Sequence, residues 1–295
     1  MTARSSSSGS TRRAGPREGR TLPERMNLKS RTAIVTGAAS GIGRGIAVSL
    51  AKRGCNLALA DVDEAGLIET ERMTASAGAK ASRHRLDVSD RQAVAAFPKE
   101  ILGAHAGVDL LVNNAGVALG GAFEEIAAED FEWLFGINFW GVVRMTRAFL
   151  PLLRASDDAR IVNISSVFGL IAPEGQTAYA ASKFAVRGFS NALMNELEGS
   201  NVGVTVVHPG GVETAIAHNA RWPKSTNPDT IAVKLAVANR ALTLPPETAG
   251  EIIVAGIEWR AKRVLVGRDA KMIALVERLA PVNHLATLKR LAGAT

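Results

Sequence analysis

Short apolar segments alternate with helical stretches along most of this chain, and this alternation limits its possible folds more than any other feature. Six short runs are expected to be strands, namely residues 32–36, 56–60, 83–87, 108–112, 160–164 and 203–207. Strands that are buried on both faces consist of such near-continuous apolar residues. Because segments of helical spacing separate them, the pattern predicts an α/β fold with a doubly wound parallel sheet.

The pattern is looser after Pro209. Trp222-Pro223 and Asn227-Pro228 indicate an irregular segment over residues 214–246, because proline interrupts regular backbone pairing. A helix over 247–260, a seventh strand over 263–267 and a helix over 269–279 are expected to follow. We therefore predict a Rossmann-type sheet of about seven strands, in a single domain of residues 26–295.

Most of the net charge lies near the N-terminus. The chain of 295 residues has a formal charge of +7, and residues 1–31 contain eight Lys or Arg against two Glu. The remainder is close to neutral, which argues against nucleic acid as a partner. Residues 1–25 are poor in bulky apolar side chains, so we predict a disordered basic tail there, with Met26 as an alternative start.

Composition also bears on the compartment. We expect no transmembrane segment, because no run of about 18 apolar residues is present, and the tail lacks the apolar centre of a secretory signal. Cys55 is the only cysteine, which excludes an internal disulfide and suits a reducing compartment. We predict a cytoplasmic protein. The histidines show no metal-ligand spacing, so no metal is expected.

A glycine-rich turn follows the first expected strand and opens a helix. Its sequence runs Thr36-Gly-Ala-Ala-Ser-Gly-Ile-Gly43. Glycines let a phosphate approach the backbone closely, and a helix N-terminus favours an anion. The turn therefore predicts a dinucleotide site, and its candidate residues are Gly37, Ser40, Gly41, Ile42 and Gly43.

Asp61 favours one dinucleotide over the other. It ends the second expected strand, 18 residues after Gly43, where an acidic residue binds the hydroxyls of the adenosine ribose. A carboxylate there would repel a 2′-phosphate, and neither Ser40 nor Val62 offers a cation to attract one. We therefore expect NAD as the cofactor, with NADP as the alternative.

Tyr179 and Lys183 are four residues apart on an expected helix, so they share one face. A nearby cation favours the phenolate, and we expect Lys183 to lower the pKa of Tyr179 from its ordinary value of about 10. As a phenolate this tyrosine can take a proton from an alcohol, and as a phenol it can donate one to a carbonyl. Tyr179 is the only tyrosine in the chain.

These motifs stand in the order that short-chain dehydrogenases/reductases show, and the chain resembles that family over residues 28–270. The matching segments are 36–43, Asp61, 86–88, 113–116, Asn138, Ser166, 179–183 and 209–214. The resemblance implies a catalytic tetrad of Asn138, Ser166, Tyr179 and Lys183. It selects Ser166 over Ser165 because the family places the serine thirteen residues before the tyrosine.

The resemblance also implies further cofactor contacts, to which Tyr179 and Lys183 themselves belong. The others are Asp87 and Val88 beside the adenine, Asn114, Ala115 and Gly116 over the cofactor, and Val212 and Thr214 at the nicotinamide carboxamide. In the same family pattern, Ser166 hydrogen-bonds the substrate oxygen. Asn138 supports a water that links Lys183 to solvent.

The expected function is that of an NAD(P)-dependent oxidoreductase that interconverts a secondary alcohol and a ketone. Its substrate is expected to be a small apolar molecule, with Phe168 and Trp222 as candidates for the pocket. Two alternatives stay open, an NADP-dependent biosynthetic ketoreductase and a dinucleotide-binding regulatory protein without turnover. The tetrad argues against the second alternative.

Two surfaces are expected to contact partners. The family usually forms dimers or tetramers through two long helices, here near residues 124–155 and 176–199, which implies a homodimer or homotetramer. Residues 271–291 mix apolar with basic side chains, which favours packing against another subunit, with contact to a membrane surface as the alternative.

Overall fold

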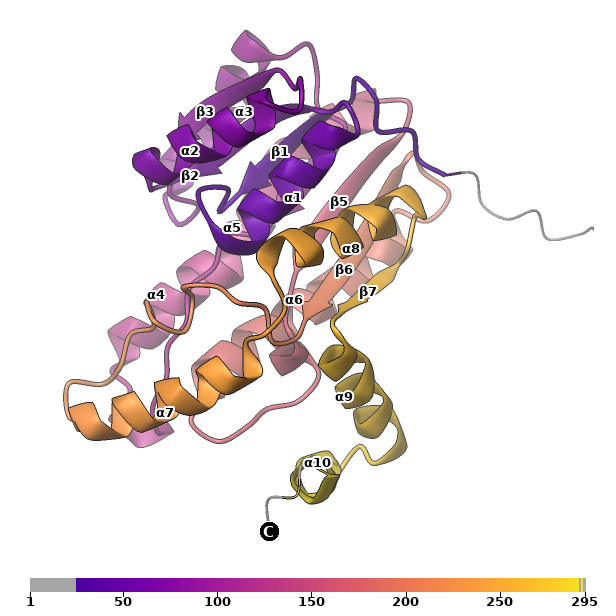
Figure 1. The fold of residues 1–295 in the computed structure, drawn as a ribbon. Helices are drawn as coiled ribbons and strands as arrows, with labels where there is room; N and C mark the ends of the chain where they lie inside the picture. The colour runs from indigo at the N-terminus through magenta and orange to yellow at the C-terminus, as the bar shows by residue number, and fades with distance from the viewer. Residues whose placement is uncertain (1–24, 292, 294–295) are drawn as a thin grey trace, which may run out of the picture.

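The computed structural model describes residues 25–291 and 293, which form one sheet with helices on both faces (Figure 1). The predicted tail lies outside these residues except for Arg25, whose guanidinium stacks on the Trp259 ring at 3.7 Å. None of the helices in the described part of the chain is long and apolar enough to cross a membrane.

The sheet has seven parallel strands in the order β3-β2-β1-β4-β5-β6-β7. They are β1 (Thr32–Thr36), β2 (Asn56–Asp61), β3 (Ala81–Arg85), β4 (Leu110–Asn113), β5 (Ala159–Ile164), β6 (Val202–Pro209) and β7 (Arg263–Val266). The strand order reverses direction at the β1–β4 neighbourhood, and a ligand crevice forms at such a switch point. The predicted Rossmann-type sheet of seven strands is confirmed.

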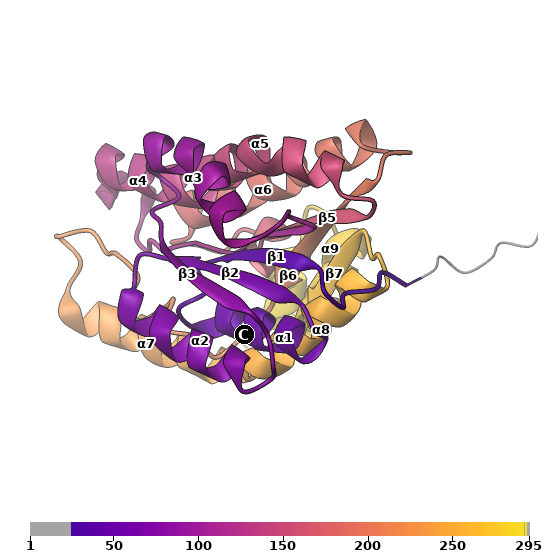
Figure 2. The same ribbon diagram turned by 90° about the horizontal axis from the view of Figure 1, so that it is seen from above.

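Helices cover both faces of the sheet (Figure 2). One face carries α1 (Gly41–Lys52), α2 (Glu64–Ala75) and α8 (Pro246–Glu258), and the other carries α3 (Arg91–Ala104), α5 (Trp140–Ala155) and α6 (Thr177–Glu196). Because side chains alternate along a strand, Ala33 and Val35 of β1 join the first core and Ile34 joins the second.

The remaining elements lie at or beyond the carboxyl ends of the strands. They are α4 (Ala128–Asn138), the short 3₁₀ helices η1 (Phe123–Glu125) and η2 (Val167–Gly169), α7 (Pro228–Ala241), α9 (Arg268–Leu279) and α10 (His284–Leu291). In Figure 1 they occupy the lower part of the molecule, whereas the N-terminal described residues approach the sheet from its other edge.

The third strand starts and ends two residues earlier than predicted. β3 pairs with β2 from Leu57↔Ala81 to Asp61↔Arg85, so it ends at Arg85 and not at Asp87. This strand lies at the sheet edge and is rich in basic residues, so the local apolar pattern is weak. Backbone pairing with β2 determines where it lies.

The segment over residues 214–246, predicted to be irregular, contains the helix α7. The Asn227-Pro228 pair begins this helix, because the Asn227 side chain accepts a hydrogen bond from the Asp229 N–H at 2.8 Å. Proline is well tolerated in the first turn, where its missing N–H has no intrahelical partner. Pro228, one of the prolines that indicated an irregular segment, is therefore the first residue of a helix.

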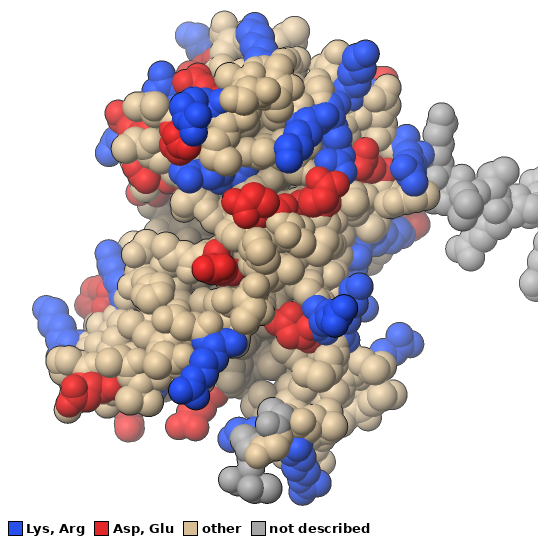
Figure 3. Space-filling view, viewed as in Figure 1, with Lys and Arg blue, Asp and Glu red and all other residues tan. Residues whose placement is uncertain are grey.

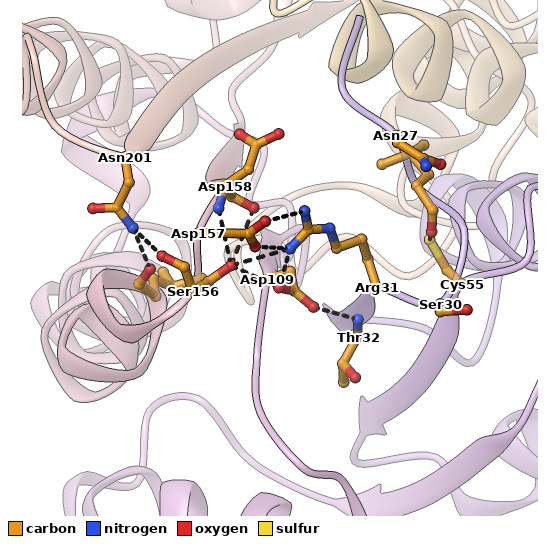
Figure 4. A network of polar contacts seen from close by, with 12 residues as sticks. Asn27, Ser30, Arg31, Thr32, Cys55, Asp109, Ser156, Asp157, Asp158 and Asn201 are labelled. Atoms are coloured by element: carbon orange, nitrogen blue, oxygen red, sulfur yellow. Dashed lines mark hydrogen bonds and ion pairs between the residues drawn. The ribbon is translucent and has the colours of Figure 1, made fainter.

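A polar network ties together the amino ends of the strands (Figure 4). Asp109, directly before β4, accepts hydrogen bonds from the Thr32 N–H at 2.8 Å, the Arg31 guanidinium at 3.0 Å and the Ser156 hydroxyl at 2.7 Å. Arg31 also pairs with Asp157. The network joins β1, β4 and the loop before β5 at the amino ends of the strands, whereas the predicted site lies at their carboxyl ends.

Candidate active site

The glycine turn lies between β1 and α1, with backbone that suits glycine at two positions. Gly37 has a φ of +65° and Gly41 a φ of +52°, in the left-handed region. A Cβ on Gly43 would lie 2.0 Å from the Gly37 carbonyl oxygen and 2.5 Å from the Asn114 amide nitrogen. The turn therefore packs too tightly for any larger residue at Gly43.

The first turn of α1 fits an anion. Ser40 is extended at the N-cap of α1 and its side chain makes no capping hydrogen bond to the helix. The N–H groups at a helix start and the helix dipole then remain available to a negative group such as a pyrophosphate. Ile42 packs against the core beneath the turn and anchors it to the sheet.

Thr36 and Asn114 hold this turn against the end of β4. The Thr36 hydroxyl accepts hydrogen bonds from the N–H groups of Asn114 and Ala115, both at 3.0 Å. The Asn114 side chain donates to the carbonyl oxygens of Thr36 at 3.0 Å and Gly37 at 3.1 Å. The residues predicted to close over the cofactor thus also shape the turn. Thr36 was not among the predicted site residues, although its place before the first glycine was a signal.

Asp61 lies beside the turn at the carboxyl end of β2. Its carboxylate accepts a hydrogen bond from the Ala39 N–H at 3.0 Å, and its carbonyl oxygen accepts one from the Leu86 N–H at 2.9 Å. The second bond places the Asp87–Val88 segment next to Asp61. Three of the predicted adenosine contacts are therefore neighbours in the structure.

Asp87 and Val88 differ in their surroundings. The exposed Asp87 carboxylate accepts hydrogen bonds from the Ser89 N–H at 2.8 Å and hydroxyl at 2.7 Å. Val88 is buried against Gly141 of α5, where a Cβ would lie 2.8 Å from the valine side chain. Arg44, interpreted from the sequence as a surface residue, is half-buried and donates to the Ala39 carbonyl oxygen.

Ser166 and Tyr179 meet at the carboxyl end of β5. Ser166 caps η2, and its hydroxyl accepts a hydrogen bond from the Phe168 N–H at 3.1 Å. Tyr179, in the first turn of α6, is hydrogen-bonded to Ser166 and meets the Phe168 ring edge-on at a centroid distance of 6.1 Å. The buried Ser165 hydroxyl instead donates to the Lys183 carbonyl oxygen at 2.8 Å. The geometry therefore favours Ser166 as the serine that faces the tyrosine.

Lys183 and Asn138 lie behind the tyrosine. Lys183 is 3% exposed, and its Nζ donates to the Ile164 carbonyl oxygen at 3.1 Å and lies 5.7 Å from the centroid of the Tyr179 ring. Asn138, fully buried at the end of α4, accepts from the Val117 N–H at 2.9 Å and donates to the Val117 carbonyl oxygen at 3.0 Å. These bonds fix the loop after β4 against α4.

The pKa values of this pair differ from the prediction. Burial raises the pKa of Tyr179 to about 12, although the hydrogen bond with Ser166 lowers it in part. Burial also lowers the pKa of Lys183 to about 8. The predicted lowering of the Tyr179 pKa by Lys183 is therefore wrong, because desolvation of the phenolate dominates. At neutral pH Tyr179 is a phenol and can act as a proton donor.

The loop after β6 completes the site. Val212 is 3% exposed and pairs with Leu244, and a Cβ on Gly41 would lie 3.1 Å from the Thr214 methyl group. The two residues predicted at the nicotinamide therefore lie across from the glycine turn. A Cβ on Gly116 would lie 3.4 Å from the Lys183 Nζ, which links the same crevice to the tyrosine.

Two residues that sequence reasoning missed support this loop and Ser166. Asp269 of α9 accepts a hydrogen bond from the Gly211 N–H at 2.6 Å. The two residues are 58 positions apart, so no local sequence pattern predicts this contact. His208 is fully buried at the end of β6, and its Nδ1 donates to the Ser166 carbonyl oxygen at 2.9 Å. Burial lowers the pKa of His208 to about 4, so it is neutral at physiological pH.

Phe168 and Trp222 are the aromatic residues predicted for the substrate pocket, and Phe168 contacts Tyr179. Trp222 packs on Gly120, where a Cβ would lie 2.7 Å from its ring. Its neighbour Arg221 pairs with Asp130 at 2.9 Å and stacks on Trp133 at 3.5 Å, which fastens the segment after β6 to α4. Tyr179 belongs to the apolar cluster below these residues.

Comparisons with known proteins agree with this arrangement. Residues 31–224 match the short chain dehydrogenase family. The chain is 43% identical to the Mycobacterium tuberculosis protein named "Putative oxidoreductase SadH", over 86% of this chain and 92% of that protein. It is 37% identical to oxidoreductase UcpA of Escherichia coli, over 72% of this chain and 81% of that protein.

Solved structures show the same fold. A short-chain dehydrogenase/reductase from Burkholderia phymatum in complex with NAD superposes with a TM-score of 0.77 at 31% identity, over 86% of this chain and 95% of that one. A short-chain dehydrogenase from Mycobacterium paratuberculosis bound to NAD gives a TM-score of 0.72 at 25% identity, over 84% of this chain and 100% of that one. The protein therefore belongs to the short-chain dehydrogenase/reductase family and is an oxidoreductase with the family's dinucleotide-binding fold.

Proposed function

We propose that this protein uses NAD to interconvert a secondary alcohol and an apolar ketone. The observation that carries the proposal is the hydrogen-bonded pair of Ser166 and Tyr179 beside the buried Lys183, at the edge where the glycine turn ends. Bound NAD would accept or supply the hydride. The structural neighbours that were solved with NAD support a dinucleotide in this crevice.

The residues act on the proton of the substrate oxygen. The Ser166 hydroxyl holds that oxygen, and the Tyr179 phenol donates a proton to it during carbonyl reduction. Lys183, with a pKa of about 8, is protonated at neutral pH and favours the phenolate that remains. In the reverse direction Tyr179 must first lose its proton, so alcohol oxidation is expected to accelerate as the pH rises, because the pKa of Tyr179 is raised.

Asp61 supports NAD in preference to NADP. Its carboxylate is held by the Ala39 N–H, directly beside the turn that would receive the pyrophosphate. A 2′-phosphate on the adenosine ribose would approach this negative charge. The half-buried Arg44 guanidinium is held by Ala39, Gly66 and Thr70 through its Nε and Nη2 atoms.

A homo-oligomer belongs to the same proposal. Members of the family associate through the helices that correspond to α4, α5 and α6 here, and Trp140 and Phe184 expose apolar surface on these helices. A homodimer or homotetramer through this side would cover both residues. Its mass in solution, measured by light scattering after size-exclusion chromatography, tests this part separately.

Nicotinamide absorbance tests the function directly. Purified protein is mixed with NAD or NADP and a panel of secondary alcohols, or with the reduced cofactors and the matching ketones. Tyr179→Phe removes the proton donor and is expected to lower turnover by about 10²–10⁴-fold while cofactor binding is retained. Leu102→Ala, a change at an exposed residue of α3, which carries none of the site residues, serves as the control and should leave turnover unchanged.

Each outcome decides between the alternatives. Turnover with NADP alone would replace the proposal by the NADP-dependent ketoreductase. Cofactor binding without turnover on any panel member, with Tyr179→Phe indistinguishable from wild type in every measurement, would favour the regulatory protein. Turnover that survives in Tyr179→Phe would contradict the assigned role of Tyr179.

A further inference from the structure

One face of α9 exposes a row of large apolar side chains. Met272, Leu275 and Leu279 are 47%, 57% and 75% exposed, and their spacing puts them on one side of the helix. Val282 at 86%, after the end of α9, and Leu291 at 64%, at the end of α10, are also exposed. No other stretch of similar length in the described residues exposes as many large apolar side chains.

Basic side chains surround this row. Lys271 and Arg278 are exposed on α9, and Lys289 and Arg290 are exposed on α10. Residues 268–291 contain five Lys or Arg against two acidic residues. Of those two, Asp269 is bound to the Gly211 N–H and Glu277 is half-buried. In Figure 3 the α9–α10 region, at the lower edge, shows tan surface with blue side chains at its margins.

We propose that this α9–α10 face binds a membrane surface that contains anionic phospholipids. The face consists of Met272, Leu275, Leu279, Val282 and Leu291 together with Lys271, Arg278, Lys289 and Arg290. A helix with an apolar stripe and flanking cations lies in the interface, with its apolar side chains at the acyl boundary and its cations near the phosphates. Such binding requires no spanning helix.

Charge complementarity selects lipid over a second copy of the chain. A two-fold contact places the same patch on both subunits, so the surplus of cations on this face would meet an equal surplus on the other copy. Of the two acidic residues of α9, Asp269 is held by the Gly211 N–H and Glu277 is half-buried, so the four exposed cations of the face outnumber them. Anionic headgroups supply the opposite charge to every exposed cation of the face.

The position of α9 connects this surface to the site. Asp269 in its first turn holds the loop that contains Val212, and α9 contacts η2, which follows Ser166. A membrane at this face would therefore lie on the side of the crevice. If the proposed function is correct, an apolar ketone dissolved in lipid would be near its site of reduction, but binding to the membrane does not depend on that.

Sedimentation with vesicles tests the proposal on the full chain. Vesicles of phosphatidylcholine alone and of phosphatidylcholine with phosphatidylglycerol are compared. The variant Leu275→Ser/Leu279→Ser is expected to bind the anionic vesicles about tenfold more weakly than wild type. Val233→Ser/Val237→Ser on α7, at 65% and 62% exposure, removes equivalent apolar surface elsewhere and should bind as wild type does.

A fluorescent probe reports where the contact occurs. Leu279→Cys is labelled with an environment-sensitive dye, and Val233→Cys is the control. Cys55 is buried and burial raises its pKa to about 12, so its thiol reacts poorly with the reagent. A blue shift on addition of anionic vesicles is expected at position 279 and not at position 233.

Three results would overturn the proposal. Equal binding by wild type and Leu275→Ser/Leu279→Ser would mean that another part of the chain, such as the basic residues 1–31, holds the vesicles. Absence of binding to any vesicle would exclude it outright. A lower mass of the Leu275→Ser/Leu279→Ser variant by light scattering, without vesicle binding by wild type, would assign the face to a second subunit. Turnover of a water-soluble alcohol by the variant separates these results from failure of the proposed function.

Discussion

Ser165 and Ser166 show how the surroundings of a side chain assign its chemistry. Both are serines at the end of β5, yet Ser165 is used inside the protein to bind the Lys183 carbonyl oxygen, whereas Ser166 is hydrogen-bonded to Tyr179. His208 beneath Ser166 is neutral and donates to its backbone. The position of Ser166 is therefore supported by the His208 side chain of the neighbouring strand β6.

The choice of cofactor is expected to depend on the charge at residue 61. Asp61→Asn keeps an oxygen to accept the Ala39 N–H but removes the negative charge. We expect catalytic efficiency with NAD to fall by about tenfold relative to NADP, because the repulsion of a 2′-phosphate is lost. Steady-state kinetics with both cofactors measure the ratio. Asp63→Asn, two residues away at the start of α2, is the control, and an unchanged ratio in Asp61→Asn would contradict the NAD assignment.

Buried His208 is expected to make stability depend on pH. Its pKa is about 4 in the folded protein and has the ordinary value of 6.5 when unfolded, so the unfolded chain binds more protons between these values. The free energy of unfolding should therefore fall as the pH falls from 6.5 to 4, by about 3 kcal/mol for this group. Urea unfolding at both pH values measures it. His208→Asn keeps a donor for Ser166 but cannot titrate, and it should show a correspondingly smaller fall.

At the scale of elements, the helices α1 and α8 pack through glycines. A Cβ on Gly45 would lie 2.3 Å from the Pro246 carbonyl oxygen, and one on Gly250 would lie 2.2 Å from the Gly45 carbonyl carbon. The two backbones are thus in direct contact. Because α1 begins at the cofactor turn, the position of this turn depends on the close approach of α8.

Alanine at Gly250 should disturb this packing. We expect Gly250→Ala to lower the free energy of unfolding by about 2–3 kcal/mol, since its methyl group would overlap backbone that cannot move away. Gly103→Ala on α3 has no atom within 4 Å of the added Cβ and is expected to raise stability by about 0.5 kcal/mol. Denaturant unfolding compares the two, and equal effects would refute the close contact.

At the scale of the whole molecule, the carboxyl ends of the strands carry the candidate site, and their amino ends carry a polar network that stabilises the sheet. The carboxyl edge collects the glycine turn, Asp61, Ser166 and the loop after β6, whereas the amino edge contains the Asp109 network (Figure 4). A parallel sheet places all strand ends of one kind at one edge. Stability and chemistry can therefore be altered separately.

Asp109→Ala is expected to test this separation. The change removes the acceptor of Thr32, Arg31 and Ser156, and we expect a loss of about 2–3 kcal/mol in the free energy of unfolding. The Michaelis constants at a temperature where the protein is folded should stay within about twofold of wild type. Asp157→Ala removes an exposed partner of Arg31 and should destabilise less. A large change in KM would show that the edges are coupled.

Local patterns predicted the regular parts of the fold. The strands β1, β2, β4, β5, β6 and β7 were recognised because buried parallel strands are continuous apolar runs, and the turn was recognised because glycine spacing and a following helix occur together. The edge strand β3 and the helix α7 were misplaced or missed. Neither β3 nor α7 has a buried apolar stripe in its sequence. Pairing with β2 determines where β3 lies, and the Asn227 N-cap determines where α7 begins.

The sequence by itself determined the order of the strands along the chain, the glycine turn, and the residue types that the family's chemistry needs. Only the tertiary structure decided how these are used, because burial and contacts across long separations are not written in local patterns. Burial raises the pKa of Tyr179 where its lysine neighbour predicted a lowering, and Asp269 reaches Gly211 across 58 residues. The exposed face of α9 is decided in the same way, since helical spacing places residues on one side of a helix but does not tell whether anything covers that side.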